Sequence, residues 1–297
     1  MDNFNTTPKG TEAAAARHVL GLPEDAPLTF DDRGWTSRVY LYQQGQKVVK
    51  FPRTEAVKEE YRAEAQAYVR INRLLDSLTS APVRLPVLLS LGPETSYLAY
   101  AGIPGKTLDL APPLSEAELK RVGQQLGSFL KQLRGLRLDH GHDHTLKDDL
   151  EELQHKYGLG KDYLSTHLDT AEQKALKTFV QQTVPDILQQ LGYKSVLCHG
   201  DLGYWNMVYE PGQTIGLIDF GDVGYYDESL DFVGLQDEQL QTAAFETYGA
   251  SEPLKEKTRW RQRVLPVLEL PFYLGKNNEQ GALRTLKRIQ DMLKSLL

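Results

Sequence analysis

The stretch CHGDLGYWNMVYEPGQTIGLIDFGD, residues 198–222, places several polar side chains around two short apolar runs. Residues 206–209 and 214–220 have the composition and length of β-strands, and the Glu-Pro-Gly-Gln sequence between them is typical of a tight turn. The pattern predicts a β-hairpin. Its two free ends meet at one place, and the polar residues are expected to gather there.

Asn206 and Asp219 are expected to face each other at the open end of this hairpin. A turn centred near Gly212 and Gln213 leaves both residues about equally far from the centre, and opposite residues of an antiparallel pair have adjacent side chains. One carboxylate and one carboxamide suit Mg²⁺, which takes one or two protein oxygens and fills its other positions with water and phosphate oxygens. Asp201 lies on the loop leading to the same end, where a carboxylate that does not hold the metal can orient and deprotonate a hydroxyl.

A buried charge is predicted in the N-terminal part of the chain. Glu64 lies on the apolar stripe of a helix, whose other members follow at spacings of three and four: Val57, Tyr61, Tyr68, Ile71 and Leu75. An inward carboxylate without a partner costs several kcal/mol, so Glu64 needs a cation. Lys50 ends the preceding strand and is the candidate, because a lysine held by a glutamate can hold nucleotide phosphates.

The N-terminal third of the chain has the pattern of a small sheet with one helix. Alternating runs over residues 38–51 predict a hairpin, and a second strand pair is expected over 87–91 and 96–100. Gly-Ile-Pro-Gly at 102–105 interrupts the pattern. We place the boundary of the lobes there, which predicts an N-terminal lobe of residues 1–101.

The second predicted lobe, residues 102–297, is mainly helical. Ser115 and Glu118 form the capping box that starts an amphipathic helix, and a second long helix is expected over 171–191. The hairpin of residues 206–220 interrupts the helices. The sequence therefore predicts a two-lobed α+β protein with a small antiparallel-sheet N-lobe and a larger, mainly helical C-lobe.

The composition is that of an ordinary soluble globular protein. The 297 residues are 40% hydrophobic and 25% charged, no apolar run approaches the ~20 residues needed to cross a bilayer, and the N-terminus lacks the features of a secretory signal. The single cysteine, Cys198, excludes an internal disulfide, and a formal net charge of -6 argues against a nucleic-acid partner. We expect a cytoplasmic monomer that binds small molecules and neither nucleic acid nor membranes.

The chain resembles the aminoglycoside phosphotransferase family of kinase-like small-molecule kinases. The resemblance is carried by Val-Val-Lys-Phe-Pro-Arg at 48–53, an inward helix glutamate, the break at 101–105, His-Gly-Asp-Leu-x-x-x-Asn at 199–206 and Ile-Asp-Phe-Gly-Asp at 218–222. It covers nearly the whole chain and is nearest to the branch acting on the 2″-hydroxyl, in which a Lys-Phe-Pro-Arg strand end and an Asp-Phe-Gly-Asp turn also occur. The resemblance implies a two-lobed protein-kinase-like fold with the nucleotide between the lobes.

The resemblance also implies roles for the polar residues of these motifs. Asp201 would be the catalytic base, and Asn206 and Asp219 would be the Mg²⁺ ligands. Lys50, paired with Glu64, would contact the phosphates of ATP or GTP. The implied reaction is transfer of the γ-phosphoryl group to a hydroxyl of a small molecule, an aminoglycoside in the first place.

Further nucleotide contacts are implied in the N-terminal lobe. The loop Gly-Trp-Thr-Ser at 34–37, which ends with Ser37, would cover the nucleotide, although it departs from the glycine-rich loop of protein kinases. The segment that contains Tyr100, Ala101 and Ile103 would meet the purine through backbone groups.

Four residues are candidates for binding the acceptor. An aminoglycoside is a polycation, so its site needs carboxylates near the catalytic base. Asp237 and Glu238 begin an expected helix after the hairpin, and Glu269 precedes the aromatic residue Tyr273. We expect these four residues to form the acceptor wall, with the alternative that the acidic pair is a solvated helix face and the aromatic side chain belongs to the core.

Other functions stay open from the sequence. The acceptor can be a metabolite such as choline, a sugar or an amino alcohol, and a non-catalytic nucleotide-binding module is a further alternative, although every residue of the expected catalytic set is present. A protein kinase is disfavoured because no Ala-Pro-Glu segment follows the hairpin. His140, His142 and His144 alternate as in some transition-metal sites, but an exposed loop explains them equally well.

Overall fold

The computed structural model describes residues 10–32, 34, 36–77, 81–138 and 143–294. Contacts within the chain define two compact units, which are described separately. The first contains Met1–Gly141, His199–Val223 and Leu235–Tyr248, and the second contains His142–Cys198, Gly224–Gly234 and Gly249–Leu297. The predicted lobes divide the chain once, after residue 101, whereas the units divide it several times because segments distant in sequence pack together. The lobe boundary stays a prediction.

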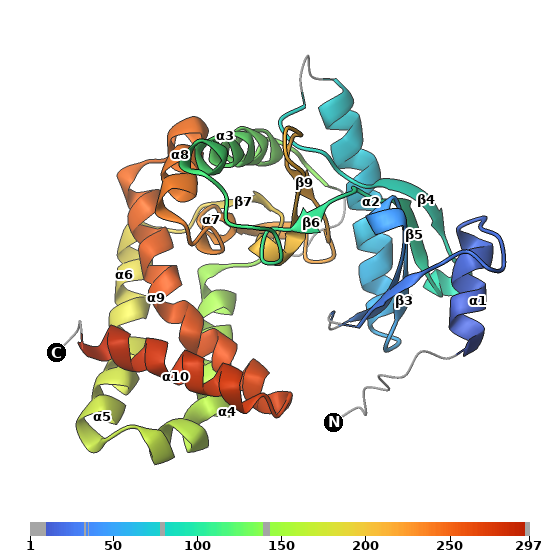
Figure 1. Cartoon of the computed structure of the whole chain (residues 1–297). Coiled ribbons are helices and arrows are strands. Elements are labelled where there is room, and N and C mark those ends of the chain that lie inside the picture. The colour runs from blue at the N-terminus through green and yellow to red at the C-terminus, as the bar shows by residue number, and fades with distance from the viewer. Residues whose placement is uncertain (1–9, 33, 35, 78–80, 139–142, 295–297) are drawn as a thin grey trace. The chain divides into compact units, whose positions relative to one another are not determined.

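The first unit contains a five-stranded antiparallel sheet with the strand order β1-β2-β3-β5-β4 (Figure 1). Its strands are β1 (Thr29–Asp31), β2 (Ser37–Tyr42), β3 (Lys47–Pro52), β4 (Val87–Leu91) and β5 (Leu98–Ala101). Both predicted strand pairs are present, and Gln43, Gln44 and Gly45 all have positive φ in the turn that joins β2 to β3. The expected antiparallel N-terminal sheet is confirmed.

Two helices cover the two faces of this sheet (Figure 1). Helix α1 (Gly10–Val19) packs on one face, where the buried cluster contains Ala16, Leu20, Tyr40, Val49 and Ala99. Helix α2 (Val57–Asp76) lies on the other face, and its predicted stripe is buried throughout: Val57, Tyr61, Glu64, Tyr68, Ile71 and Leu75. Because side chains alternate along a strand, Lys50 points to the α2 face while Val49 points to α1. The sheet therefore directs Lys50 toward Glu64.

The predicted hairpin is present, but its register differs by one residue from the expectation. Strands β8 (Met207–Tyr209) and β9 (Gly216–Leu217) pair in a three-stranded sheet with β6 (Lys106–Thr107), in the order β6-β8-β9. Met207 is opposite Leu217, and the Ile218 N–H donates to the Asn206 carbonyl at 3.0 Å. Asn206 is therefore opposite Ile218, not Asp219.

The cause of the difference is the turn between these strands. The register is centred on Gly212 alone, which has φ of +79°, and not between Gly212 and Gln213. A positive φ is accessible to glycine without strain, so the chain reverses at Gly212 and the pairing shifts by one residue. Arg84 then joins this hairpin to the segment before β4, through backbone hydrogen bonds of 2.8 and 2.9 Å to Ile215 and Leu217.

Helices α3 (Glu116–Leu133) and α8 (Glu238–Tyr248) complete the first unit. The predicted capping box at the start of α3 is confirmed: the Ser115 N–H donates to the Glu118 carboxylate at 2.8 Å, and the Ser115 hydroxyl accepts from the Glu118 N–H at 3.4 Å. The two helices are in backbone contact, because a Cβ added at Gly123 or Gly127 would lie less than 3.0 Å from a carbonyl oxygen of α8.

The second unit is mainly helical, as predicted for this part of the chain. It contains α4 (Leu146–His167), α5 (Thr170–Thr178), α6 (Val184–Leu191), α7 (Leu230–Val233), α9 (Glu252–Gly275) and α10 (Glu279–Lys294), with β7 (Ser195–Cys198) paired antiparallel to β10 (Gly224–Asp227). The helix expected over 171–191 is present as α5 and α6, joined by a π-turn over Phe179–Thr183. Pro185 lacks the N–H that a regular ladder needs at this point, which accounts for the widened turn.

A buried carboxylate, Asp227, joins the elements of the second unit. Its side chain is fully buried and accepts hydrogen bonds from Lys257 Nζ at 2.6 Å, from the Lys194 N–H at 3.0 Å, and from both the N–H and the hydroxyl of Ser229. With four donors and one paired cation, the buried charge is compensated. None of the helices in the described ranges is both long and apolar enough to cross a membrane.

Gly127→Ala is expected to destabilise the protein, whereas Gly158→Ala on α4 is not. The new methyl group at residue 127 meets the Ala244 carbonyl oxygen, so α3 and α8 must separate, at a cost of about 1–3 kcal/mol. Gly158 is exposed with open space around it, and alanine there should stabilise the helix by about 0.5–1 kcal/mol. Urea denaturation measures both. A stabilisation of equal size in the two variants would contradict the close contact between α3 and α8.

Candidate active site

Lys50, Glu64 and Asp219 meet in the first unit. The Lys50 ammonium donates to Glu64 Oε1 at 2.8 Å and to Asp219 Oδ1 at 3.0 Å. Lys50 and Glu64 are 6% and 2% exposed, whereas the Asp219 side chain is 48% exposed. The expected Lys50–Glu64 contact is present, and it brings with it the aspartate of the hairpin. One cation thus joins β3, α2 and the end of the hairpin.

The charges of these three groups stabilise one another. Burial opposes the charged form of Lys50, but the Asp219 and Glu64 carboxylates outweigh it and hold the pKa of Lys50 well above its usual value. Burial likewise raises the pKa of Glu64, against the attraction of Lys50. For Asp219, burial is outweighed by the Lys50 ammonium, and its pKa is lowered. Lys50 stays a cation and Asp219 a carboxylate at neutral pH.

Tyr68 connects the same groups from α2. Its hydroxyl donates to Glu64 Oε1 at 2.9 Å and accepts from the Asp219 N–H at 3.1 Å. Its ring lies 5.7 Å from the Tyr100 ring and 5.6 Å from the Phe220 ring, measured between centroids. The helical stripe predicts that Tyr68 points inward, but no pattern in the sequence indicates these two hydrogen bonds.

Asp219 has an unusual backbone conformation. Its φ is +66°, in the left-handed region that a residue with a side chain adopts at a cost. The conformation follows directly after β9 and turns the Asp219 side chain toward Lys50, although the register of the hairpin does not place it opposite Asn206. The expected pairing of Asn206 with Asp219 across the hairpin is therefore absent, and the contact that Asp219 makes from this turn is with Lys50.

Asp201 and Asn206 are joined on the loop before β8. Asp201 Oδ2 accepts from Asn206 Nδ2 at 2.9 Å and from the Trp205 indole N–H at 3.0 Å. Asn206 Nδ2 also donates to the Asp201 carbonyl at 2.8 Å. Both donors are directed to Oδ2, so the Asp201 carboxylate is held in one orientation. Its second oxygen, Oδ1, accepts neither of these bonds.

His199 fixes this loop to the hairpin. Its Nδ1 accepts from the Asp201 N–H at 3.3 Å, and its Nε2 lies 3.0 Å from the Ile218 carbonyl. An Nδ1 that accepts leaves the proton on Nε2, which therefore donates to Ile218. Burial lowers the pKa of His199 to about 4, so the ring is neutral at physiological pH. His199 thus has the geometry of a residue that braces the loop against the hairpin.

Carboxylates outnumber cations around Asp201. Burial raises the pKa of Asp201 to about 6, the Trp205 indole opposes this, and the charges of Asp222 and Asp219 raise it further. The pKa of Glu60 is also raised, first by burial and then by the charges of Asp222 and Asp219. Such a group of carboxylates is electrostatically suited to a cation bound from solution.

Asp219 and Asn206 fit the donor chemistry of Mg²⁺. The Asp219 carboxylate is half exposed, and Asn206 directs its amide nitrogen to Asp201, so that the carboxamide oxygen is the atom that would bind a metal. No three His, Cys, Asp or Glu side chains of the described chain are grouped as a metal site. His140 and His142 lie outside the described residues, and His144 stacks on Tyr226 with centroids 4.4 Å apart.

The residues expected to meet the nucleotide are placed as follows. Ser37 begins β2 and is 4% exposed, and its hydroxyl accepts from the Tyr61 hydroxyl at 2.7 Å. Tyr100 and Ala101 end β5, with the Tyr100 ring 5.9 Å from the Lys50 ammonium, and Ile103 is buried. Trp35, in the loop before Ser37, lies outside the described residues.

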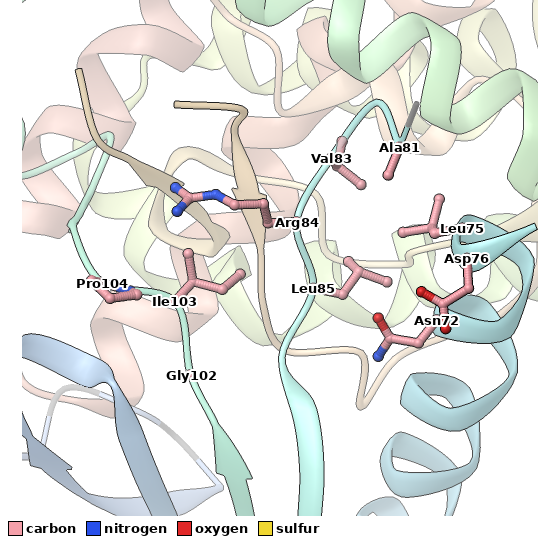
Figure 2. A pocket seen from close by; sticks show the side chains of 10 residues that line it. All are labelled: Asn72, Leu75, Asp76, Ala81, Val83, Arg84, Leu85, Gly102, Ile103 and Pro104. Atoms are coloured by element: carbon pink, nitrogen blue, oxygen red, sulfur yellow. The ribbon is translucent and has the colours of Figure 1, made fainter. Parts of the chain in front are cut away.

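A pocket lies beside the segment that follows β5 (Figure 2). It has a volume of about 300 Å³ and is lined by Asn72, Leu75, Asp76, Ala81, Val83, Arg84, Leu85, Gly102, Ile103 and Pro104. Figure 2 shows α2 on one side of it and the Gly102–Pro104 backbone on the other. Gly102 and Ile103, from the segment expected to meet the purine, are in this lining, whereas Lys50, Asp201 and Asp219 are not.

The expected acceptor residues fall into both units. In the first, Asp237 Oδ1 accepts from the Gln239 and Leu240 N–H groups at 3.0 and 3.1 Å, which caps the start of α8. The Asp237 N–H donates to the Tyr204 hydroxyl at 3.1 Å, so α8 is tied to the Asp201 loop, and Glu238 is exposed beside it.

Glu269 and Tyr273 lie in the second unit. Glu269 is paired with Arg288 of α10, and burial raises its pKa against this attraction. The Tyr273 ring packs over Gly281, where a Cβ would lie less than 3.0 Å from the ring carbons, and it borders the core of the unit. The core interpretation of Tyr273 is therefore the one that the packing favours.

Sequence reasoning did not identify Trp205. Its side chain is 50% exposed, yet its indole N–H holds the Asp201 carboxylate. The available signal was a large aromatic residue directly before Asn206 in a polar loop. Exposed aromatic side chains in such loops are often binding groups. Trp205 is therefore a further candidate for contact with the acceptor, in addition to its hydrogen bond to Asp201.

Comparisons with known proteins agree with this geometry. A sequence model of the phosphotransferase enzyme family matches residues 27–261. The GDP and kanamycin complex of APH(2″)-IIia has a TM-score of 0.77 and 17% identity, covering 97% of this chain and 100% of that chain. The gentamicin complex of APH(2″)-IIa has a TM-score of 0.72 and 16% identity, with coverages of 98% and 97%. A choline/ethanolamine kinase family protein from Mesorhizobium loti has a TM-score of 0.65 and 16% identity, with coverages of 95% and 94%. These likenesses confirm the predicted kinase-like α+β fold.

Lys50→Met is expected to destabilise the protein strongly, and Glu64→Gln in the same background should restore part of the loss. Removing the ammonium leaves a buried carboxylate without a cation, which costs about 3–5 kcal/mol. The free energies of unfolding of the two single variants and the double variant give the coupling between the residues. Lys58→Met, at the exposed pair with Glu55, is the control and should change stability by about 0.5 kcal/mol or less. Additive effects at Lys50 and Glu64 would mean that the two residues are not partners.

Proposed function

The chain belongs to the phosphotransferase enzyme family, and we propose that it transfers the γ-phosphoryl group of ATP or GTP to a hydroxyl of an aminoglycoside. The observation that carries this proposal is the convergence of Lys50, Asp219, Asn206 and Asp201 in one compact unit. A phosphate-binding cation, two oxygen ligands for a metal and a free carboxylate oxygen are the groups that such a transfer needs.

Asp201 acts on the acceptor. Its Oδ2 already accepts two hydrogen bonds, so Oδ1 is the atom that receives the proton of the attacking hydroxyl. The two donors fix the direction of Oδ1, which aligns the hydroxyl for attack, and alignment supplies a large part of the rate. Burial together with the neighbouring carboxylates makes Asp201 a stronger base than a free aspartate.

Lys50, Asn206 and Asp219 act on the nucleotide. The Lys50 ammonium is positioned by Glu64 and contacts a phosphate oxygen as a point charge. Asp219 and Asn206 would hold Mg²⁺, which would supply neutralisation of the phosphate charge. The solved relatives were obtained with GDP, ATP or ADP, which supports either purine nucleotide as the donor. Both nucleotides are abundant in the cytoplasm, where we place the reaction.

An aminoglycoside is the acceptor that the charges favour. Asp222 and Glu238 are exposed, and Asp237, which caps α8, is linked through Tyr204 to the Asp201 loop. A polycation gains from such carboxylates at a partly desolvated site. The fold likeness includes proteins crystallised with kanamycin and gentamicin, which supports the same class.

A metabolite kinase is the second candidate. The likeness to a choline/ethanolamine kinase family protein favours it, because choline is a small cation with one hydroxyl and needs fewer carboxylates than an aminoglycoside. The catalytic residues would have the same roles. The two candidate functions differ in how many carboxylates of the acceptor wall the acceptor would contact.

Asp201→Asn and Asp219→Asn should impair the enzyme in different ways. Asp201→Asn removes the base and should lower kcat by about 10²–10⁴ with little change in Mg–nucleotide affinity. Asp219→Asn removes the charged metal ligand and should weaken Mg–nucleotide binding together with turnover. Steady-state kinetics and calorimetry separate the two effects. Undiminished turnover of Asp201→Asn would remove this residue from the mechanism.

Asp237→Asn combined with Glu238→Gln should weaken an aminoglycoside acceptor without affecting the nucleotide. Asparagine caps a helix as well as aspartate does, so α8 keeps its start while two negative charges are lost. We expect a loss of about 1–3 kcal/mol in acceptor binding, smaller at high salt. The measurement is kcat/KM for kanamycin at low and high ionic strength.

The control for this prediction is Glu246→Gln, which removes an exposed charge two turns further along α8. It should leave kanamycin kinetics unchanged. If the double variant also behaves as the parent protein, or if neutral acceptors are used as well as kanamycin, the aminoglycoside assignment fails and the metabolite kinase is favoured.

A further inference from the structure

We propose that Tyr68 is a positioning residue whose hydroxyl sets the Asp219 carboxylate for binding of the Mg–nucleotide. The proposal rests on the proposed function, since it concerns the same site. Tyr68 belongs to α2 and is fully buried, so it acts through Glu64 and Asp219 and does not itself reach the substrates.

Four hydrogen bonds form a closed ring around this hydroxyl. The Tyr68 hydroxyl donates to Glu64 Oε1 at 2.9 Å, and Lys50 donates to the same oxygen at 2.8 Å. Lys50 also donates to Asp219 Oδ1 at 3.0 Å, and the Asp219 N–H donates to the Tyr68 oxygen at 3.1 Å. The ring joins α2, β3 and the end of the hairpin. Asp219 is held at two points, by its side chain and by its backbone.

The chemistry of the groups fixes the direction of each bond. An ionised Glu64 carboxylate only accepts, and the Asp219 backbone N–H only donates. The group between them must therefore donate one hydrogen bond and accept another, which a phenolic hydroxyl does. The Tyr68 hydroxyl makes both bonds at once, to Glu64 as donor and to the Asp219 N–H as acceptor.

The backbone of Asp219 is the part that needs this support. A φ of +66° is costly for a residue with a side chain, and such conformations persist where surrounding contacts enforce them. The Tyr68 oxygen supplies one such contact at the N–H of the strained residue. Without it, Asp219 can relax to an ordinary conformation, which would turn its carboxylate away from Lys50.

The ring of Tyr68 has a separate role in packing. It lies between the rings of Tyr100 and Phe220, and Phe220 directly follows Asp219. Phenylalanine at position 68 would retain both ring contacts and lose only the oxygen. Tyr68→Phe therefore separates the hydrogen bonds from the packing.

The test is binding of the β,γ-imido analogues of ATP and GTP to Tyr68→Phe by calorimetry, with and without Mg²⁺ and without any acceptor. We expect the Mg–nucleotide complex of the better-bound analogue to bind about tenfold or more weakly than to the parent protein, since bonds to a charged and a strained group are lost. Metal-free nucleotide should bind nearly as before, and the KM of the acceptor should change by less than about twofold. Amide hydrogen exchange at Asp219 should be faster in the variant.

The control is Tyr40→Phe on β2. The Tyr40 hydroxyl is also buried and donates to a carboxylate, Glu12 Oε2, at 3.2 Å, but it lies on the α1 face of the sheet. Its removal should lower the melting temperature without a change in Mg–nucleotide affinity. Should Tyr68→Phe not fold, amide hydrogen exchange of the parent protein tests the same bond: the Asp219 N–H should exchange slowly because the Tyr68 oxygen accepts from it, and fast exchange there would overturn the proposal.

The outcomes separate the proposal from the function on which it rests. If the parent protein binds the Mg–nucleotide and Tyr68→Phe binds it equally well, the positioning role is wrong and the function stands. If Tyr68→Phe weakens nucleotide equally with and without Mg²⁺, the hydroxyl only stabilises the fold, and the proposal is likewise overturned. If the parent protein binds neither analogue, the proposed function itself fails.

Discussion

The buried Lys50 ammonium is the interaction on which the candidate site is built. A cation that is 6% exposed must be compensated, and Lys50 is compensated by carboxylates from two different elements, Glu64 of α2 and Asp219 after β9. The pairing fixes the helix, the central sheet and the hairpin to one another within the first unit. Lys50 pairs with both carboxylates at once, while the charges of Asp222 and Asp219 still act on Asp201 and raise its pKa, after burial.

The sequence predicted the parts of this arrangement that follow from periodicity and local chemistry. A glutamate on an apolar helical stripe must point inward, and an inward glutamate must have a cation, so the Lys50–Glu64 contact could be derived without a structure. The hairpin was predicted from its strands and turn residues, but its register was wrong by one because several turn geometries fit the same Pro-Gly sequence. In a strand a shift of one residue reverses the facing of a side chain, and the left-handed φ of Asp219 restores its direction.

Contacts between segments distant in sequence were beyond this kind of reasoning. The stripe shows that Tyr68 is inward, but whether its hydroxyl meets a backbone N–H some 150 positions later depends on tertiary packing. The same holds for Asp227 and Lys257, a buried pair in the second unit that no local pattern reveals. Asp237 illustrates the opposite case, because one residue has both a local role as a helix cap and a proposed role toward the acceptor.

The carboxylates near Asp201 indicate an order in which the metal–nucleotide complex and the acceptor would bind. In addition to burial, the charges of Asp222 and Asp219 disfavour the ionised form of Asp201. A metal brought in with a nucleotide would satisfy Asp219 first, because Lys50 and Tyr68 already hold that residue in place. Under the proposed function, the remaining charge at Asp201 and Asp222 would favour a cationic acceptor over a neutral one. On this reasoning the bound metal–nucleotide complex prepares the acceptor side, and the buried lysine determines which carboxylate is left for each ligand.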